Sequence, residues 1–174
     1  MRIARRPINN IIEKALDLVS IGKWSQLRKK YYYDKLFHLS LQLTLEDGTV
    51  YSFEKFDVVS LYEDKRCSDR GVDCIDITEY QQNSLTLNDL VKNPLDSMSN
   101  ESYFVYSPFE FNCQAFISGI LKHHNLLSDK NKKFINQDLK DIISNLPTFT
   151  KWFAKAFTDI SAKIKELRGD GVDA

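Results

Sequence analysis

Glycine is scarce in this chain of 174 residues, which contains six glycines and no Gly-rich loop. Two common motifs depend on such glycines, because only glycine lets the backbone turn sharply beside a phosphate or a nucleophilic serine. Neither a phosphate-binding loop nor a Gly-x-Ser-x-Gly motif is present. The sequence therefore argues against a P-loop nucleotide-binding protein and against a serine hydrolase built on a nucleophile elbow.

Cysteine is also rare, and the three cysteines are an odd number, which argues against a disulfide framework and favours a reducing compartment. Cys67 and Cys74 lie seven positions apart, a spacing that fits no common zinc-binding pattern, and no second pair is nearby. We therefore predict neither a bound metal nor another cofactor.

Long apolar runs are missing, since no segment approaches the roughly 20 apolar residues that a membrane-spanning helix needs. Residues 8–21 are rich in apolar side chains, but Glu13, Lys14 and Asp17 interrupt them, as in an amphipathic helix rather than a signal peptide. We expect an intracellular protein without a signal peptide or a transmembrane helix.

Charge of one sign is not in excess, because Lys plus Arg and Asp plus Glu both number 24. This balance gives no reason to expect nucleic acid as a partner. The start of the chain is nonetheless basic, which indicates a solvated surface or a surface for an acidic partner or membrane headgroups. The basic residues of this segment are Arg2, Arg5, Arg6, Lys14, Lys23, Arg28, Lys29, Lys30 and Lys35.

The chain length and the 43% share of apolar residues suit one globular domain with its own core. Helical and strand-like patterns occupy separate parts of the chain, which predicts an α+β fold, a small antiparallel sheet with helices at both ends. We predict a single domain over residues 1–174, with a core at about 34–125, N-terminal helices at about 7–33 and C-terminal helices at about 132–168.

Four helices are predicted at the two ends of the chain from apolar residues at helical spacing. Pro7 suits the first position of a helix that ends near Gly22. Another helix is expected over 24–33. Towards the carboxyl end we predict a helix over 134–146, stopped by Pro147, and a last helix over 149–167.

A β-hairpin is predicted in the core. Four leucines from Leu39 to Leu45 alternate with polar residues that begin at His38, which is typical of a half-buried strand. Asp47-Gly48 is a strong hairpin turn. A second strand is expected within residues 49–59, with Tyr51 and Phe53 as its apolar positions.

Less regular patterns between residues 67 and 106 give weaker predictions. We expect a loop over 67–74, a short strand over 75–78, a capped turn entering a helix at 84–90, a polar loop over 93–101 and a strand over 103–106.

The segment Asn112-Cys113-Gln114 places a cysteine where a polar loop becomes a helix-periodic run that continues to about His124. A thiol in the first turn of a helix meets the positive end of the helix dipole and free N–H groups, which favour the nucleophilic thiolate. The alternative is an unreactive core cysteine. The apolar residues of this helix are Phe116, Ile117, Ile120 and Leu121.

His38 is the histidine placed to act as a base for Cys113. His123 and His124 lie near the far end of the same helix, about 15 Å away at 1.5 Å per residue. A general base must come within hydrogen-bonding distance of the group that it deprotonates. A histidine on the polar face of a strand can also be merely exposed.

Glu54 is the candidate for the group that orients His38. A tight hairpin places position 54 opposite or diagonal to position 38 on the same face. A shift of one residue in the register moves Glu54 to the other face and makes Asp57 the alternative. An exposed strand carboxylate is the remaining interpretation.

The order of these motifs resembles the circularly permuted NlpC-like hydrolases of the papain-fold superfamily, in which the histidine strand precedes the cysteine helix. The resemblance covers roughly residues 10–165 and depends on His38, Asp47-Gly48, Glu54-Lys55 and Asn112-Cys113-Gln114. The flanking segments look most like a poxvirus and giant-virus set within this group. Lecithin:retinol acyltransferase-like enzymes are more distant relatives, and they use a second histidine where this chain has glutamate.

The resemblance implies acyl transfer through sulfur, with Cys113 as nucleophile, His38 as base and Glu54 as the third group. The backbone N–H of Cys113 and a second donor are expected to hold the oxyanion. The candidates for substrate or oxyanion contacts are Asn112, Gln114, Tyr106 and Ser107.

The resemblance thus predicts a cysteine hydrolase or acyltransferase that cleaves an amide or ester of a peptide, an isopeptide-linked modifier, a cell-wall peptide or a lipid. If the protein is viral, the host cytoplasm or the virion is the expected location. One alternative is a non-catalytic binding module that keeps the fold. Another is a membrane-associated lipid enzyme whose helix at 149–167 lies on the bilayer, with Trp152 and Phe153 beside Lys151 and Lys155. A helix packed on the core explains the same pattern.

Overall fold

The computed structural model describes residues 1–7, 23–30, 37–56, 58–64, 72–78, 85–106 and 110–136. Contacts divide the chain into two compact units, one of Met1–Pro7 and Phe37–Gln137 and the other of Ile8–Leu36 and Asp138–Ala174. A single domain over the whole chain stays a prediction. The predicted helices over 8–21 and 149–167, and most of the one over 134–146, lie outside the described residues.

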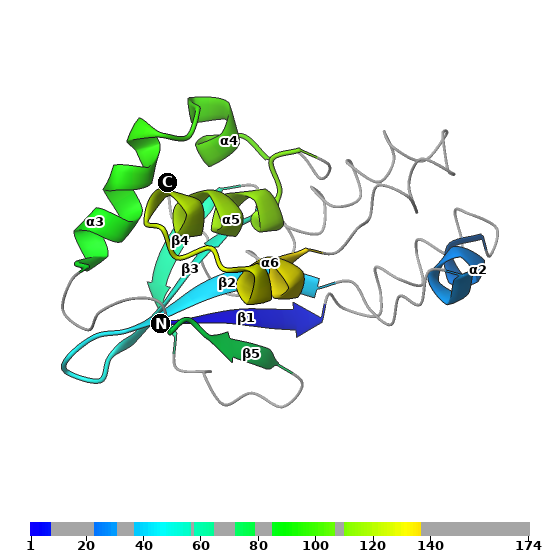
Figure 1. Cartoon of the computed structure of the whole chain (residues 1–174), viewed down its shortest axis with the longest axis horizontal. Coiled ribbons are helices and arrows are strands. Elements are labelled where there is room, and N and C mark those ends of the chain that lie inside the picture. Colours follow the sequence, from blue (N-terminus) through cyan, green and yellow to red (C-terminus); the bar gives the residue numbers. More distant parts are fainter. Residues whose placement is uncertain are drawn as a thin grey trace, which may run out of the picture. The chain divides into compact units, whose positions relative to one another are not determined.

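The first unit contains a five-stranded antiparallel sheet with the order β4-β3-β2-β1-β5 (Figure 1). The protein is therefore an α+β protein, as predicted. Its strands are β1 (Arg2–Pro7), β2 (Phe37–Thr44), β3 (Val50–Lys55), β4 (Val59–Glu63) and β5 (Asp73–Asp76).

The β2–β3 hairpin is confirmed. The turn closes with a hydrogen bond of 3.0 Å from the Gly48 N–H to the carbonyl oxygen of Leu45. Gly48 has a φ of 86°, a conformation that glycine adopts without steric cost. Phe53 is fully buried and Tyr51 half-buried, as their predicted apolar positions require.

Two predictions about this region are wrong, and one strand was not predicted. Pro7 does not begin a helix but ends β1, where it faces Phe37 at the last pair of the register and its missing N–H interrupts no later pair. The second strand expected within residues 49–59 is confirmed as β3, but β4, which begins at Val59, was not predicted. Cys74 lies within β5 rather than in a loop, because β5 pairs with β1 from Asp73 onwards.

Six helical segments are described. They are α2 (Lys23–Lys30), which is the described part of the second unit, and in the first unit α3 (Leu87–Lys92), the 3-10 helix η1 (Asn93–Asp96), α4 (Asn100–Phe104), α5 (Cys113–His123) and α6 (Asp129–Ile135). The predictions of α2 and α5 are confirmed over these residues. α3 is confirmed too, because Thr86 and Asp89 form a reciprocal capping box at its start.

The predicted loop over 93–101 and strand over 103–106 are wrong. Pro94 suits the first turn of η1, and the Ser99 hydroxyl caps α4 by accepting the N–H of Ser102. Tyr103 therefore lies in a helix, with its side chain buried. Of the helix predicted at 134–146, only the first three positions are described: Phe134 and Ile135 end α6, which Ser128 caps, and Asn136 follows the helix.

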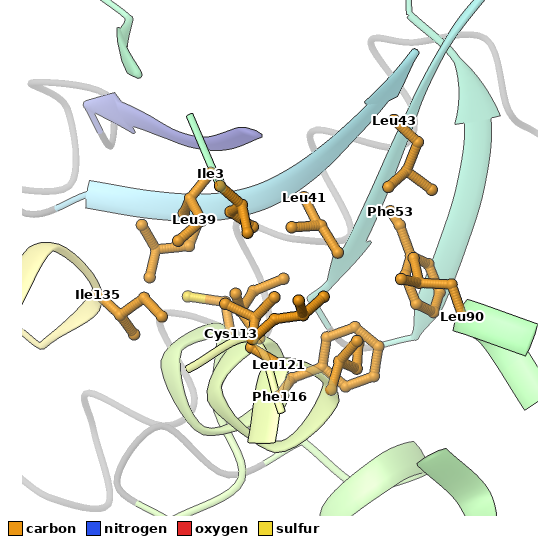
Figure 2. Packing of buried hydrophobic residues seen from close by; sticks show 14 of the residues in the cluster. Ile3, Leu39, Leu41, Leu43, Phe53, Leu90, Cys113, Phe116, Leu121 and Ile135 are labelled. Atoms are coloured by element: carbon orange, nitrogen blue, oxygen red, sulfur yellow. The ribbon is translucent and has the colours of Figure 1, made fainter. Parts of the chain in front are cut away.

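The hydrophobic core lies between the sheet and α5 (Figure 2). Leu39, Leu41 and Phe53 face the core from the sheet, and the Phe53 and Phe116 rings meet edge to face at 5.2 Å between centroids. The predicted apolar stripe of α5 is confirmed as buried. Helix α5 is therefore fixed by the sheet, and the position of Cys113 at its first residue is fixed with it.

The prediction that β2 is half-buried is wrong, because its polar face is buried as well. His38, Ser40 and Gln42 are at most 5% exposed, and so are Ser52 and Glu54 on β3. Buried polar groups need hydrogen-bond partners. His38, Gln42, Ser52 and Glu54 have such partners, whereas the hydroxyl of Ser40 has none among the described residues.

Candidate functional site

Cys113 is the first residue of α5 and is 8% exposed. Asn112 caps the helix, since its side-chain oxygen accepts the N–H groups of Gln114 and Ala115, each at 3.0 Å. The side-chain oxygen of Asn112 does not accept the N–H of Cys113. This backbone donor lies next to the thiol of the same residue. Asn112, which was predicted to contact the substrate or the oxyanion, is thus the N-cap of α5.

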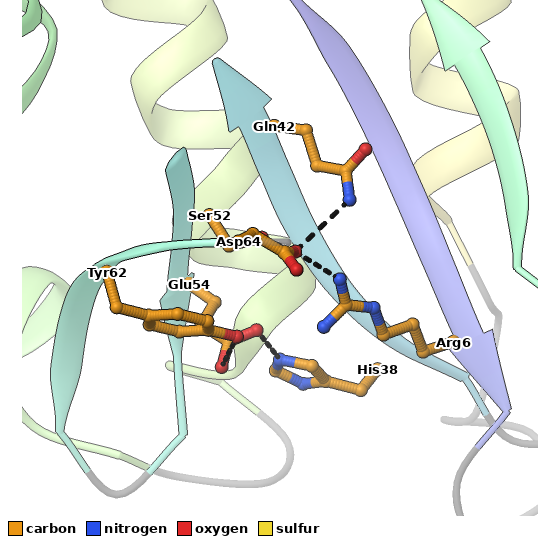
Figure 3. Close-up of polar contacts among 7 residues, drawn as sticks. All are labelled: Arg6, His38, Gln42, Ser52, Glu54, Tyr62 and Asp64. Carbon is orange, nitrogen blue, oxygen red and sulfur yellow. Dashed lines mark hydrogen bonds and ion pairs between the residues drawn. The ribbon is translucent and has the colours of Figure 1, made fainter. Parts of the chain in front are cut away.

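His38 lies where β2 and β3 separate. Strand β2 pairs with β1 as far as Phe37, but its pairing with β3 begins at Ser40, opposite Glu54. Position 54 is thus diagonal to position 38 on the same face, as the hairpin predicted. Nε2 of His38 lies 3.1 Å from Oε2 of Glu54 (Figure 3). The imidazole also stacks on Phe56, with 3.6 Å between ring centroids and 12° between planes.

The imidazole of His38 interacts with the Cys113 side chain as well as with Glu54. Burial lowers its pKa, but the charge of Glu54 and the hydrogen bonds with Cys113 and Glu54 outweigh this effect and raise the pKa to about 9. His38 is therefore an imidazolium at neutral pH. Because Nε2 is engaged by Glu54, Nδ1 is the ring nitrogen left for the thiol. The structure thus brings Cys113, His38 and Glu54 together in this order.

Glu54 is itself held in place by a residue that the sequence analysis missed. The Tyr62 hydroxyl donates to Oε1 of Glu54 at 3.0 Å, so each carboxylate oxygen has a partner. Tyr62 comes from β4 and pairs with Ser52, which places it on the same face of the sheet as Glu54. It escaped notice because β4 was not predicted, and no other signal in the sequence marks it.

A second polar cluster continues along this face of the sheet (Figure 3). Oδ2 of Asp64 accepts hydrogen bonds from the Ser52 hydroxyl at 2.5 Å and from the Gln42 amide at 3.3 Å, and it forms an ion pair with Arg6. This cluster compensates for the burial of the polar side chains beyond the His38–Glu54 pair.

Tyr106, a predicted candidate for an oxyanion contact, lies near Cys113. Burial raises the pKa of its hydroxyl, and negative charge on Cys113 raises it further. The phenol therefore stays protonated and able to donate a hydrogen bond at neutral pH. Gln114 is half-buried and follows Cys113 in α5. Ser107 and Asp57 lie outside the described residues.

Two absences hold for the described part of the chain alone. Among those residues, no group of three or more His, Cys, Asp or Glu side chains could hold a metal ion. None of the helices described is long and apolar enough to cross a membrane. Cys67 and the helix predicted at 149–167 lie outside the described residues.

A surface pocket lies at the hairpin end of the sheet rather than at Cys113. The last residues of β2 and the start of α3 contribute to its lining. Leu43 in this lining is about 17 Å from His38 along β2, at 3.3 Å per residue. The lining residues are Met1, Leu43, Thr44, Leu45, Leu85, Thr86, Leu87 and Leu90.

Comparisons of the chain with models of known protein families, with curated proteins and with solved structures find no match.

Proposed function

We propose that this protein is a cysteine hydrolase or acyltransferase with a permuted, papain-like arrangement of its catalytic groups. The observation that carries the proposal is the chain of contacts from Cys113 through His38 to Glu54, with the pKa of His38 raised to about 9. A histidine that is charged at neutral pH and hydrogen-bonds a thiol favours a thiolate–imidazolium pair.

The expected reaction begins with attack of the Cys113 thiolate on the carbonyl carbon of an amide or ester. The oxyanion of the tetrahedral intermediate accepts hydrogen bonds from the backbone N–H of Cys113 and from Tyr106. The His38 imidazolium gives its proton to the leaving amine or alcohol, and a thioester remains. Neutral His38 then takes a proton from water, or from an acceptor hydroxyl or amine, as that group attacks the thioester and frees the thiolate.

Glu54 and Tyr62 support this cycle without contacting the substrate. The carboxylate keeps Nε2 of His38 protonated and directs Nδ1 towards the sulfur, as the third group of a catalytic triad does. Tyr62 restrains the carboxylate by its own hydrogen bond. A binding module needs neither a charged histidine beside the thiol nor a group that orients it, so we prefer the catalytic alternative.

The proposal is tested with p-nitrophenyl acetate, an activated ester that makes few demands on the substrate pocket. We expect p-nitrophenolate release with an initial burst, and an acetyl thioester that peptide mass spectrometry locates on Cys113. Cys113→Ala should remove both signals, whereas Cys74→Ala, which changes an exposed free thiol, should retain them. Acetylation of Cys74 as fast as that of Cys113 would contradict the proposal.

A further inference from the structure

Lys55 is a lysine without solvent exposure at the end of β3. It alternates with Glu54 along the strand, so it lies on the same face of the sheet as Phe53, towards the core and α5. Lysine is almost never fully buried unless a partner compensates its charge.

The contacts of Lys55 place its ammonium beside the first turn of α5. Nζ donates to the carbonyl oxygen of Ser102 at 2.7 Å and lies 5.8 Å from the centroid of the Phe116 ring. Phe116 follows Cys113 by three residues, so the two side chains share the buried face of the helix. Neither a carbonyl oxygen nor an aromatic ring carries the full negative charge that a buried ammonium requires.

The thiolate that the proposed function requires at Cys113 has the missing sign. Burial lowers the pKa of Lys55 to about 8, while negative charge on Cys113 acts in the opposite direction and raises it. Two cationic side chains therefore interact with Cys113, and they come from opposite faces of the sheet. The His38 imidazolium comes from the polar face, and the Lys55 ammonium from the core face.

We propose that Lys55 is a positioning residue that acts through Cys113, because its buried ammonium favours negatively charged sulfur over the neutral thiol. This inference rests on the proposed function and deepens it. It assigns the site a second fixed cation that needs no movement or solvent rearrangement when the sulfur becomes charged. The same ammonium opposes return of the proton from His38 to Cys113.

The test compares the wild type with Lys55→Met and Lys55→Gln, the second of which keeps a donor for the Ser102 carbonyl oxygen without the charge. The rate constant for alkylation of Cys113 by iodoacetamide is measured against pH by peptide mass spectrometry, with Cys74 as internal reference. Lys122→Met, which changes an exposed lysine of the same helix, is the matched control. Circular dichroism and thermal unfolding establish that each variant is folded.

Both neutral variants should move the midpoint of the Cys113 pH–rate profile upward by about one pH unit, which is about a tenfold loss of rate at pH 6. Their rates should meet that of the wild type at high pH, where the thiol is fully ionised. Lys122→Met should leave the profile unchanged.

The two proposals fail in different ways. An unchanged profile in either folded neutral variant overturns the role of Lys55 and leaves the Cys113–His38 pair intact, and a loss confined to Lys55→Met would assign the effect to the Ser102 hydrogen bond alone. If Cys113 in the wild type reacts no faster than Cys74, the proposed function and the role of Lys55 fail together.

Discussion

Replacing His38 by alanine is expected to lower turnover of p-nitrophenyl acetate by about 10²–10⁴-fold, the range typical of a lost general acid–base. The substitution removes both the proton carrier and the positive charge beside Cys113. Because the thiol remains, alkylation of Cys113 at high pH should still proceed. The loss should therefore appear mainly in turnover and in reactivity near neutral pH.

His123→Ala is the matched control for this prediction. His123 ends α5, the helix that begins at Cys113, and its Nδ1 lies 2.6 Å from the Ser97 hydroxyl at the surface. It is therefore a histidine that does not reach the site. Its replacement should leave turnover unchanged. Equal losses in the two variants would show that stability of the fold, rather than proton transfer, underlies the effect of His38→Ala.

Replacing Glu54 by alanine is expected to lower the free energy of unfolding by about 3–5 kcal/mol, the usual cost of leaving one member of a buried ion pair without its partner. Both partners are buried, with side-chain exposures of 7% for His38 and 1% for Glu54. Glu54→Gln should cost less, because an amide can still hydrogen-bond Nε2 of His38 and Tyr62. Glu63→Gln, an exposed glutamate of neighbouring β4, should change stability by no more than about 0.5 kcal/mol.

The pH dependence of the Glu54 effect has a definite sign. A folded-state pKa of about 9 for His38, against 6.5 in the unfolded chain, contributes about 3 kcal/mol of stability, which is fully present below pH 6.5 and lost as pH rises through 9. Lys55 titrates with the opposite sign, because its pKa is lowered. The difference between the wild type and Glu54→Gln, measured by urea unfolding from pH 6 to pH 10, isolates the His38 contribution. A difference that grows with pH would contradict the assigned charge of His38.

Local patterns predicted the elements on which the site depends. The alternation of β2, the Asp47-Gly48 turn and the apolar stripe of α5 are short-range signals, and each gave the correct element. The hairpin register followed from the turn alone and brought Glu54 diagonal to His38. These features could be predicted because each is decided by neighbouring residues.

Strand β1 was missed because distant partners decide it. It pairs with β2 and β5 across long stretches of sequence, and its short basic segment carries no strong alternation of its own. Strand β4 and helix α4 have local partners but weak patterns: β4 pairs with the preceding strand β3 across a short turn, and Ser99 caps α4 from within the same segment. Of the supporting residues of the site, Tyr62 belongs to the missed strand. Lys55 lies on the same face of β3 as Phe53, which was predicted to be apolar, and a charged residue at such a position gives no signal of its own.

The most direct test of the proposed function is the rate of iodoacetamide alkylation at Cys113 and Cys74 against pH, in the wild type and in His38→Ala. We predict that Cys113 of the wild type reacts faster than Cys74 at pH 6, although it is buried and Cys74 is exposed. This advantage should disappear in His38→Ala. A Cys113 that gains reactivity only near pH 8.5, as an ordinary thiol does, or that reacts equally in both proteins, would contradict the proposed thiolate–imidazolium pair.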